Sequence, residues 1–269
     1  MRKYLKIVFF LISVSFFSQI KLKTYNEKTP KGFAFLANND EFCPVSVLVE
    51  LELDNMKSSE GNNKIFVVPA RTKGYVITNL EYVKKGKYSF KTKTRFNYGN
   101  HLEAKQDTTF AYSLPFESNK KFKIVQGYNG SRTHQNENSL DFSMPINSSI
   151  YAVRSGVVIK VVEHNTKTCY KKECSKYNNE VLIYHKDGTF SSYVHINTNG
   201  VLVNVGDEII EGQLIAKSGN IGWSSGPHLH FVVFNQRIEK RETLKTKFKV
   251  NDGSEKMYLI EKKTYTRNY

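Results

Sequence analysis

The sequence has no second long apolar run after its first residues, no convincing amphipathic helix and only three cysteines. The absence of a second apolar run excludes a membrane bundle, and a content of 39% hydrophobic and 24% charged residues excludes a disordered chain. With three cysteines there is no second pair to complete a four-cysteine zinc site. Acidic residues are scarce as well, 25 against 40 basic ones, which gives a formal charge of +15.

Residues 1–18 are typical of a secretory signal peptide. Arg2, Lys3 and Lys6 form a basic start, and residues 7–17 are apolar apart from serines. A run this short cannot cross the ~30 Å core of a bilayer as a helix, but it suits the hydrophobic part of a signal peptide. We expect cleavage near residue 18, with an uncleaved anchor as the alternative, and the lack of a nearby cysteine argues against a lipoprotein. The predicted product is exported to the periplasm, cell envelope or exterior, without an integral membrane span.

The charge of the mature chain would be +12 after loss of those three cations. A basic surface suits nucleic acid, an anionic membrane or an acidic polymer, or it serves solubility alone. Export disfavours nucleic acid as a partner, and the net charge does not distinguish among the other possibilities.

The cysteines indicate one local disulfide. Cys169 and Cys174 are separated by four intervening residues in a polar stretch, so an oxidising compartment favours a bridge between them. Two free thiols in a mobile loop are the alternative. If the bridge merely trims a loop, its reduction should leave activity largely intact. Cys43 is interpreted as a small buried hydrophobic residue.

Residues 19–105 are predicted to form a small antiparallel β domain of the Ig-like sandwich type. Short apolar or alternating runs with Gly and Asn clusters between them are typical of strands. These runs lie at 44–53, 64–69, 75–80 and 87–96. The domain shows no catalytic pattern, and its isolated His101 is interpreted as an ordinary surface residue.

Residues 106–236 are predicted to form a second all-β domain. Turn signals such as Asp187-Gly188 and Asn199-Gly200 separate its strand-like runs, which favours hairpins. The runs lie at 140–144, 150–152, 156–162, 180–185, 190–195, 213–216 and 229–234. Residues 237–269 form a basic C-terminal extension with weak strand patterns, which either packs on one of the domains or forms a binding appendage.

The motif His-Leu-His at 228–230 places two imidazoles together. In a strand, residues i and i+2 point to the same face, so His228 and His230 project together while Leu229 and Phe231 face the packed side. Both histidines could bind one zinc ion, or one could bind while the other serves the substrate. The motif alone is weak, because His-x-His occurs by chance in many chains.

His134 and Asp141 add a nitrogen and a carboxylate oxygen. A catalytic zinc takes three protein ligands and leaves a fourth position to water, and these two residues with one histidine of the pair supply three. Calcium, which takes six or more oxygens, fits this set less well. The other histidine of the pair and His195 would then move protons or bind an oxyanion. His164 and His185 lie outside this pattern, and the absence of a HExxH helix excludes a thermolysin-type site.

The order of these motifs resembles that of the lysostaphin-type (LytM-like) zinc metallopeptidases, which are peptidoglycan endopeptidases. The resemblance covers roughly residues 112–236 and includes QGYNG, DFSMP, YAVRSGVV, YHKDGTFSSYVH and VNVGDEIIEGQLIAKSGNIG. It implies a compact antiparallel β metallopeptidase domain of the duplicated hybrid motif type, with a long groove over the metal. The last run also resembles biotinyl and lipoyl carriers, but it has no modifiable lysine at the tip of a turn.

The resemblance assigns roles to five residues. It implies that His134, Asp141 and His230 hold one Zn²⁺ and that His195 and His228 are the catalytic pair. The substrate would be the stem or cross-bridge peptides of peptidoglycan, and acidic stems agree weakly with the basic chain. The insertion at 165–176 is not a core feature of the family and could line the groove.

A non-catalytic protein is the alternative. Such a protein would bind zinc as a regulator or scaffold, attach to the cell wall, or activate another wall hydrolase. The presence of both His195 and His228 favours the enzyme, since a purely structural zinc would not need them.

Overall fold

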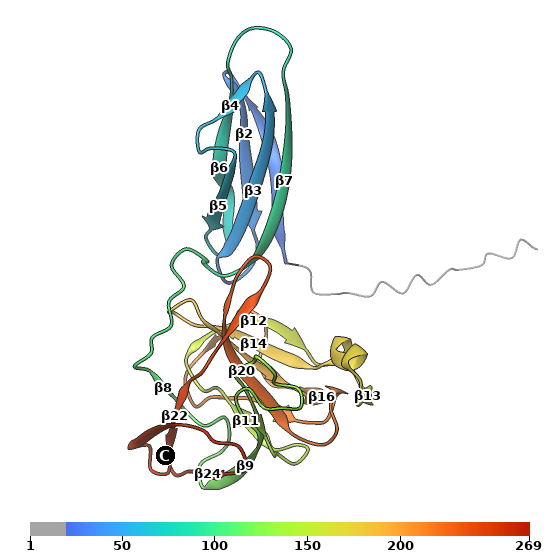
Figure 1. The fold of residues 1–269 in the computed structure, drawn as a ribbon, viewed down its shortest axis with the longest axis vertical. Helices are drawn as coiled ribbons and strands as arrows, with labels where there is room; N and C mark the ends of the chain where they lie inside the picture. The colour runs from blue at the N-terminus through green and yellow to red at the C-terminus, as the bar shows by residue number, and fades with distance from the viewer. Residues whose placement is uncertain (1–19) are drawn as a thin grey trace, which may run out of the picture.

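The structure, a computed structural model, describes residues 20–269. The predicted signal peptide, residues 1–18, lies outside the described residues. No helix within 20–269 is long and apolar enough to cross a membrane. The fold is all-β as predicted, and the only helix in this range is the short 3₁₀ helix η1 (Lys172–Tyr177). An elongated N-terminal sandwich stands on a larger C-terminal part (Figure 1).

The N-terminal part is a sandwich of two antiparallel sheets, in the strand orders β1-β2-β6-β4 and β5-β3-β7. Its β-branched and aromatic residues favour strands, and the alternation in β3 places Val45, Val47 and Val49 in the shared core. The strands are β1 (Leu22–Thr29), β2 (Gly32–Asn39), β3 (Val45–Asp54), β4 (Met56–Ser58), β5 (Asn63–Val68), β6 (Thr72–Tyr82) and β7 (Ser89–Tyr98).

The C-terminal part is built around one large sheet, in the order β17-β12-β14-β15-β20-β10-β9-β24, with β21 paired to β20. The strands are β9 (Lys120–Gln126), β10 (Ser139–Phe142), β12 (Gly156–Val162), β14 (Glu180–Tyr184), β15 (Phe190–Val194), β17 (Glu208–Ile209), β20 (Leu229–Gln236), β21 (Arg241–Leu244) and β24 (Thr264–Arg267). Most of these agree with the predicted strands to within one or two residues.

Three small sheets complete this part, in the orders β11-β18-β16, β13-β19 and β23-β22-β8. Their strands are β8 (Ala111–Tyr112), β11 (Ser149–Tyr151), β13 (Thr168–Cys169), β16 (Ile196–Val201), β18 (Leu214–Ser218), β19 (Gly222–Trp223), β22 (Lys247–Val250) and β23 (Glu255–Tyr258). The basic C-terminal extension packs on this part, because β22 pairs with β8 and β24 pairs with β9.

The two faces of the large sheet have different roles. Leu229 and Phe231 of β20 point into the main core, whereas His230, Val232 and Phe234 alternate onto the other face. That second face is divided along its length. Its apolar half, with Val232 and Phe234, packs on the N-terminal sandwich, and its polar half, with His230, stays open.

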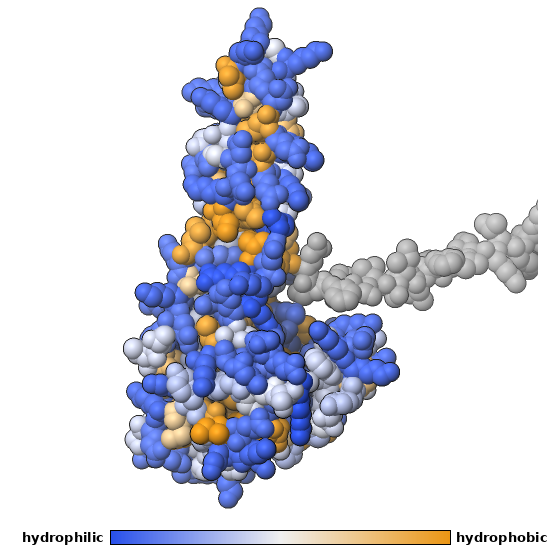
Figure 2. Space-filling model, viewed as in Figure 1, coloured by the Kyte–Doolittle hydropathy of each residue, from blue (hydrophilic) through white to orange (hydrophobic). Residues whose placement is uncertain are grey.

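The sandwich docks through a small apolar cluster. Cys43 is fully buried there, as predicted, and burial raises the pKa of its thiol to about 12. Phe42 lies against Gly206, whose backbone has φ +100°, so that a side chain at 206 would collide with the ring. Figure 2 shows apolar residues gathered where the two parts meet. The sandwich is thereby held beside the polar half of the sheet.

The interpretation of His101 as a surface residue is wrong. The residue is buried at this junction, its Nε2 lies 2.8 Å from the Tyr98 carbonyl oxygen, and its own carbonyl accepts a hydrogen bond from Arg237 at 2.9 Å. The sequence before residue 105 gave no sign of this burial, because it depends on packing against residues more than 130 positions later.

Candidate active site

Sheet register brings the first two candidate ligands together. Asp141 in β10 lies directly opposite His230 in β20, so their side chains emerge from neighbouring strands on the same face. His134 comes from the loop between β9 and β10. Its Nδ1 lies 3.1 Å from the Gly127 carbonyl oxygen, an acceptor that fixes the proton on Nδ1 and leaves Nε2 as the possible ligand.

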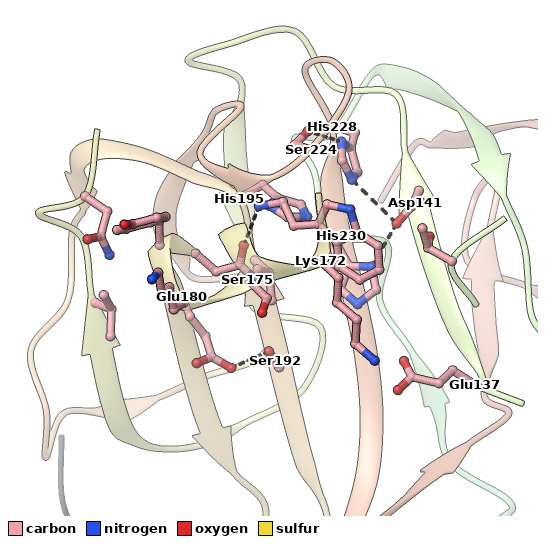
Figure 3. Close-up of a pocket in the computed structure, with 18 of the residues that line it drawn as sticks. Glu137, Asp141, Lys172, Ser175, Glu180, Ser192, His195, Ser224, His228 and His230 are labelled. Atoms are coloured by element: carbon pink, nitrogen blue, oxygen red, sulfur yellow. Dashed lines mark hydrogen bonds and ion pairs between the residues drawn. The ribbon is translucent and has the colours of Figure 1, made fainter. Parts of the chain in front are cut away.

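The three candidate ligand atoms form a tight triangle. Asp141 Oδ1 lies 2.9 Å from His230 Nδ1 and 3.2 Å from His134 Nε2, and the two nitrogens are 3.2 Å apart. Ligands at ~2.0–2.1 Å from a tetrahedral zinc lie ~3.3 Å from each other. Two imidazoles and one carboxylate suit zinc chemically and leave one coordination position for water. The residues therefore fit the metal. Figure 3 shows Asp141 and His230 side by side in the site.

The carboxyl group of Asp141 is charged in this setting. Its burial alone would raise the pKa, but hydrogen bonds with His134 and His230 outweigh burial and hold the pKa well below its usual range. Gln126 supports the same group, since its amide nitrogen lies 3.4 Å from Asp141 Oδ2 and also donates to Thr133 Oγ1 at 2.6 Å. An anionic carboxylate held in place is what a dication requires.

His195 occupies the point where the chain leaves the large sheet. β15 ends at Val194, β16 of a small sheet begins at Ile196, and His195 between them has φ +66°, a left-handed conformation that costs energy in a non-glycine residue. Its Nδ1 donates to the Ile221 carbonyl oxygen at 2.7 Å. Burial, followed by the neighbouring His228 and His230, lowers its pKa to about 3. The ring is fixed and neutral.

His228 lies beside His195, with the ring centroids 4.6 Å apart. Its Nδ1 donates to the Gly226 carbonyl oxygen at 2.8 Å and lies 3.2 Å from Ser224 Oγ. Its Nε2 is 3.7 Å from Asp141 Oδ1, at the edge of the candidate ligands. Burial lowers the pKa of this histidine too. In both rings Nδ1 therefore donates a hydrogen bond to a backbone carbonyl oxygen, and Nε2 is available to a substrate or water.

Ser224 was not identified from the sequence, although it holds the His228 loop. Its hydroxyl donates to Asn220 Oδ1 at 2.6 Å and contacts the Gly226 carbonyl oxygen at 2.8 Å.

We expect Ser224→Ala to lower kcat about three- to tenfold at unchanged zinc content, because His228 loses a constraint on its ring. Steady-state kinetics beside metal analysis would check this, and a kcat equal to that of the unaltered protein would contradict it.

His185, which lies outside the pattern of candidate residues in the sequence, plays no part in this cluster. It follows β14, is fully buried, and its ring nitrogens contact the Ser155 carbonyl oxygen at 2.8 Å and Ser191 Oγ at 2.9 Å. Burial lowers its pKa to about 4, so it is a neutral structural histidine. The structure thus brings together the five residues singled out from the sequence and keeps His185, which lay outside their pattern, away from them.

The cluster lies in a groove of about 2000 Å³. The groove is lined by residues 20–22 of the N-terminal sandwich and by residues of the cysteine-bearing insertion around η1. The floor is the polar half of the large sheet, where Glu180 pairs with Lys160 at 2.7 Å and accepts from Ser192 at 2.7 Å. An extended peptide could lie in such a groove across the candidate metal site.

The model of Peptidase family M23 matches residues 135–242. The chain carries an M23 metallopeptidase domain. The match contains Asp141, His195, His228 and His230 and begins one residue after His134. The M23 domain thus coincides with the strands that build the groove floor.

Curated relatives match over part of this chain. Peptidoglycan DD-endopeptidase ShyA of Vibrio cholerae is 30% identical over 139 residues, which is 49% of this chain and 30% of that protein. Lysostaphin of Staphylococcus simulans is 35% identical over 95 residues, which is 34% of this chain and 17% of that protein. The chain therefore spans less than a third of the length of these two relatives. The solved catalytic domain of lysostaphin is 25% identical and has a TM-score of 0.34, with 46% of this chain and 87% of that one covered.

Proposed function

We propose that this protein is an exported zinc metalloendopeptidase that hydrolyses peptide bonds in the stem or cross-bridge peptides of bacterial peptidoglycan. The proposal is carried by one observation: His134, Asp141 and His230 present ligand atoms 2.9 to 3.2 Å apart beside a second pair of histidines, the buried His195 and the half-buried His228. The M23 domain supports it, as do relatives whose names describe peptidoglycan cleavage. The predicted signal peptide and the basic composition agree with action on a cell wall outside the cytoplasm.

In this proposal the three ligands would hold Zn²⁺, which supplies a Lewis acid for the scissile carbonyl and lowers the pKa of water. The other residues handle protons. His195 and His228 each donate from Nδ1 to a backbone carbonyl, so Nε2 is the basic nitrogen of both rings. Such a nitrogen takes a proton from the attacking water as the new C–O bond forms. The same nitrogen returns that proton to the leaving amine as the C–N bond breaks.

Digestion of purified peptidoglycan tests the proposal. We expect soluble fragments that carry new amino and carboxyl ends when they are identified by mass, because a peptide bond is hydrolysed. A chelator should stop the release, and added zinc should restore it. Intact peptidoglycan after incubation with the zinc-loaded protein would contradict the proposal. If the protein instead increased the activity of a second wall hydrolase, the regulator would be the correct interpretation.

A further inference from the structure

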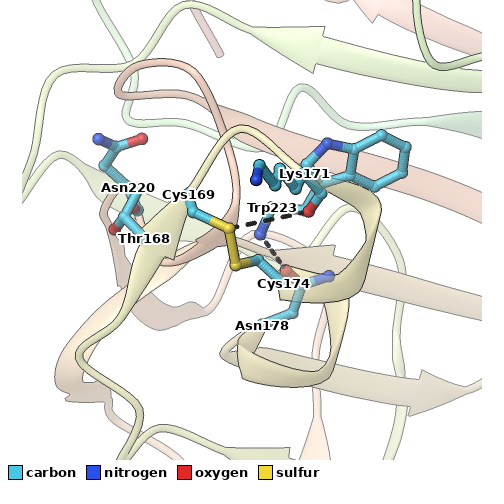
Figure 4. Close-up of a disulfide and its surroundings, with 7 residues drawn as sticks. All are labelled: Thr168, Cys169, Lys171, Cys174, Asn178, Asn220 and Trp223. Carbon is cyan, nitrogen blue, oxygen red and sulfur yellow. Dashed lines mark hydrogen bonds between the residues drawn. A yellow bond between two sulfur atoms is a disulfide. The ribbon is translucent and has the colours of Figure 1, made fainter.

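The cysteine-bearing insertion forms a fixed wall of the groove. Cys169 at the end of β13 is bonded to Cys174 in η1, as predicted, with the Cα atoms 6.0 Å apart (Figure 4). β13 pairs in parallel with β19, and the Trp223 backbone nitrogen donates to Asn178 Oδ1 at 3.0 Å. Gly222 has φ +88°, and a Cβ there would lie 2.0 Å from the same Asn178 oxygen, so only glycine allows this close packing.

This packing ties the wall to the candidate catalytic residues. Ile221, whose carbonyl oxygen accepts a hydrogen bond from His195, directly precedes β19. The Gly222 backbone nitrogen donates to the Lys167 carbonyl oxygen in the insertion at 2.8 Å. The disulfide therefore does more than shorten an exposed loop. It stabilises a surface that keeps a fixed position relative to His195.

The groove carries an excess of positive charge. Its basic lining residues are Lys21, Arg132, Lys160, Lys172, Lys176 and Arg241. Its acidic lining residues are Glu137, Asp141 and Glu180. Asp141 belongs to the candidate metal site, Glu180 is paired with Lys160, and Glu137 is paired with Arg241 at 2.9 Å. Each acidic lining residue thus already has a partner or belongs to the candidate metal site, and several basic lining residues have no acidic partner in the groove.

Two of the remaining cations lie on the insertion. Lys172 and Lys176 in η1 both line the groove, and within residues 20–269 neither forms an ion pair. Lys176 also lies over the Tyr177 ring, with Nζ 5.2 Å from its centroid. Figure 3 draws Lys172 among the side chains that line the cavity with His195 and His230. Lys171 is exposed on the same insertion but is not part of the groove lining, so it serves as a matched comparison.

We propose that Lys172 and Lys176 bind free carboxylates of the substrate peptide and make the groove selective for anionic stem peptides over neutral bridges. The inference deepens the proposed function and rests on it. A carboxylate that approaches two cations in a partly enclosed groove is screened less than one on an open surface. The wall is held by a disulfide and by β19, so little ordering is needed when the peptide binds. A neutral glycine-rich bridge would gain nothing from these two side chains.

Binding can be measured separately from cleavage, because the single tryptophan of the chain, Trp223, lines the groove. The probe is a synthetic stem peptide with free carboxylates and a reduced scissile amide, compared with the same peptide after amidation of its carboxylates. Titrated into the zinc-loaded full chain, the anionic peptide should bind about tenfold more tightly than the amidated one. We expect Lys172→Glu/Lys176→Glu to abolish this preference and Lys171→Glu to retain it.

Kinetics with the cleavable forms provide a second readout. The double variant should raise KM for the anionic peptide about tenfold, with kcat and the cleavage of the amidated peptide nearly unchanged. The milder Lys172→Gln/Lys176→Gln should give a smaller effect in the same direction, with thermal unfolding confirming that each variant folds. A preference that survives charge reversal, or no preference in the unaltered protein, would overturn the inference. Selective binding without any cleavage would overturn the proposed function and leave the binding surface standing.

Discussion

Replacement of His228 by alanine should lower kcat about 10³-fold while the zinc content stays near one per chain. The ring lies 4.6 Å from the His195 ring, and its Nε2 lies 3.7 Å from Asp141 Oδ1, so it is placed to act on protons beside the candidate metal ligands. A positioned acid or base contributes typically 10²- to 10⁴-fold to rate. Cleavage of a synthetic stem peptide, followed beside metal analysis of the same preparation, measures both quantities.

His164 provides the control for this experiment. It also lines the groove, but it is exposed and lies outside the ligand cluster, so His164→Ala should leave kcat within about twofold. Loss of zinc from the His228 variant would show that the ligand and the catalyst have been interchanged between residues 228 and 230. Normal turnover by that variant would remove His228 from the mechanism altogether.

The orientation of the His-Leu-His residues could be predicted from the sequence because it depends only on the alternation of side chains along one strand. The period of two along β20 places Leu229 and Phe231 in the core and His230 on the groove face, as the alternation predicts. The positions of Asp141 and His134 depended on the resemblance to a known family. Their approach to His230 is set by the pairing of β10 with β20 across 89 positions, and a slip of one residue would turn Asp141 to the opposite face.

Other features of the site could not be predicted because they arise only when sheets meet. The left-handed turn at His195 exists because β15 and β16 belong to different sheets, a fact that no local pattern carries. Ser224 is one of many serines until the fold places it against His228. The position of the N-terminal sandwich beside the groove depends on Phe42 and the cluster around Cys43, which the sequence identified only as a buried residue.

Asp141→Ala should remove the metal site rather than the chemistry alone. The carboxylate contacts both His134 and His230. Its loss would leave two neutral candidate ligands and remove the negative charge of the third. Substitution of residues that merely orient ligands costs 10- to 100-fold in metal affinity, so loss of the ligand itself should cost at least about 100-fold. Cleavage should fall below detection at zinc concentrations that saturate the unaltered protein, and equilibrium dialysis would measure the affinity.

Thermal unfolding measures the same loss without any substrate. A ligand that binds only the folded state stabilises it in proportion to the logarithm of its concentration over Kd, so a 100-fold weaker site forfeits about 2.7 kcal/mol at saturating zinc. Glu137→Gln is the matched control, since Glu137 lines the same groove but is paired with Arg241, and its variant should keep the full stabilisation by zinc. If Asp141→Ala still bound one zinc per chain and gained the same stability from it, the metal would have to lie elsewhere. The five clustered residues would then need another explanation.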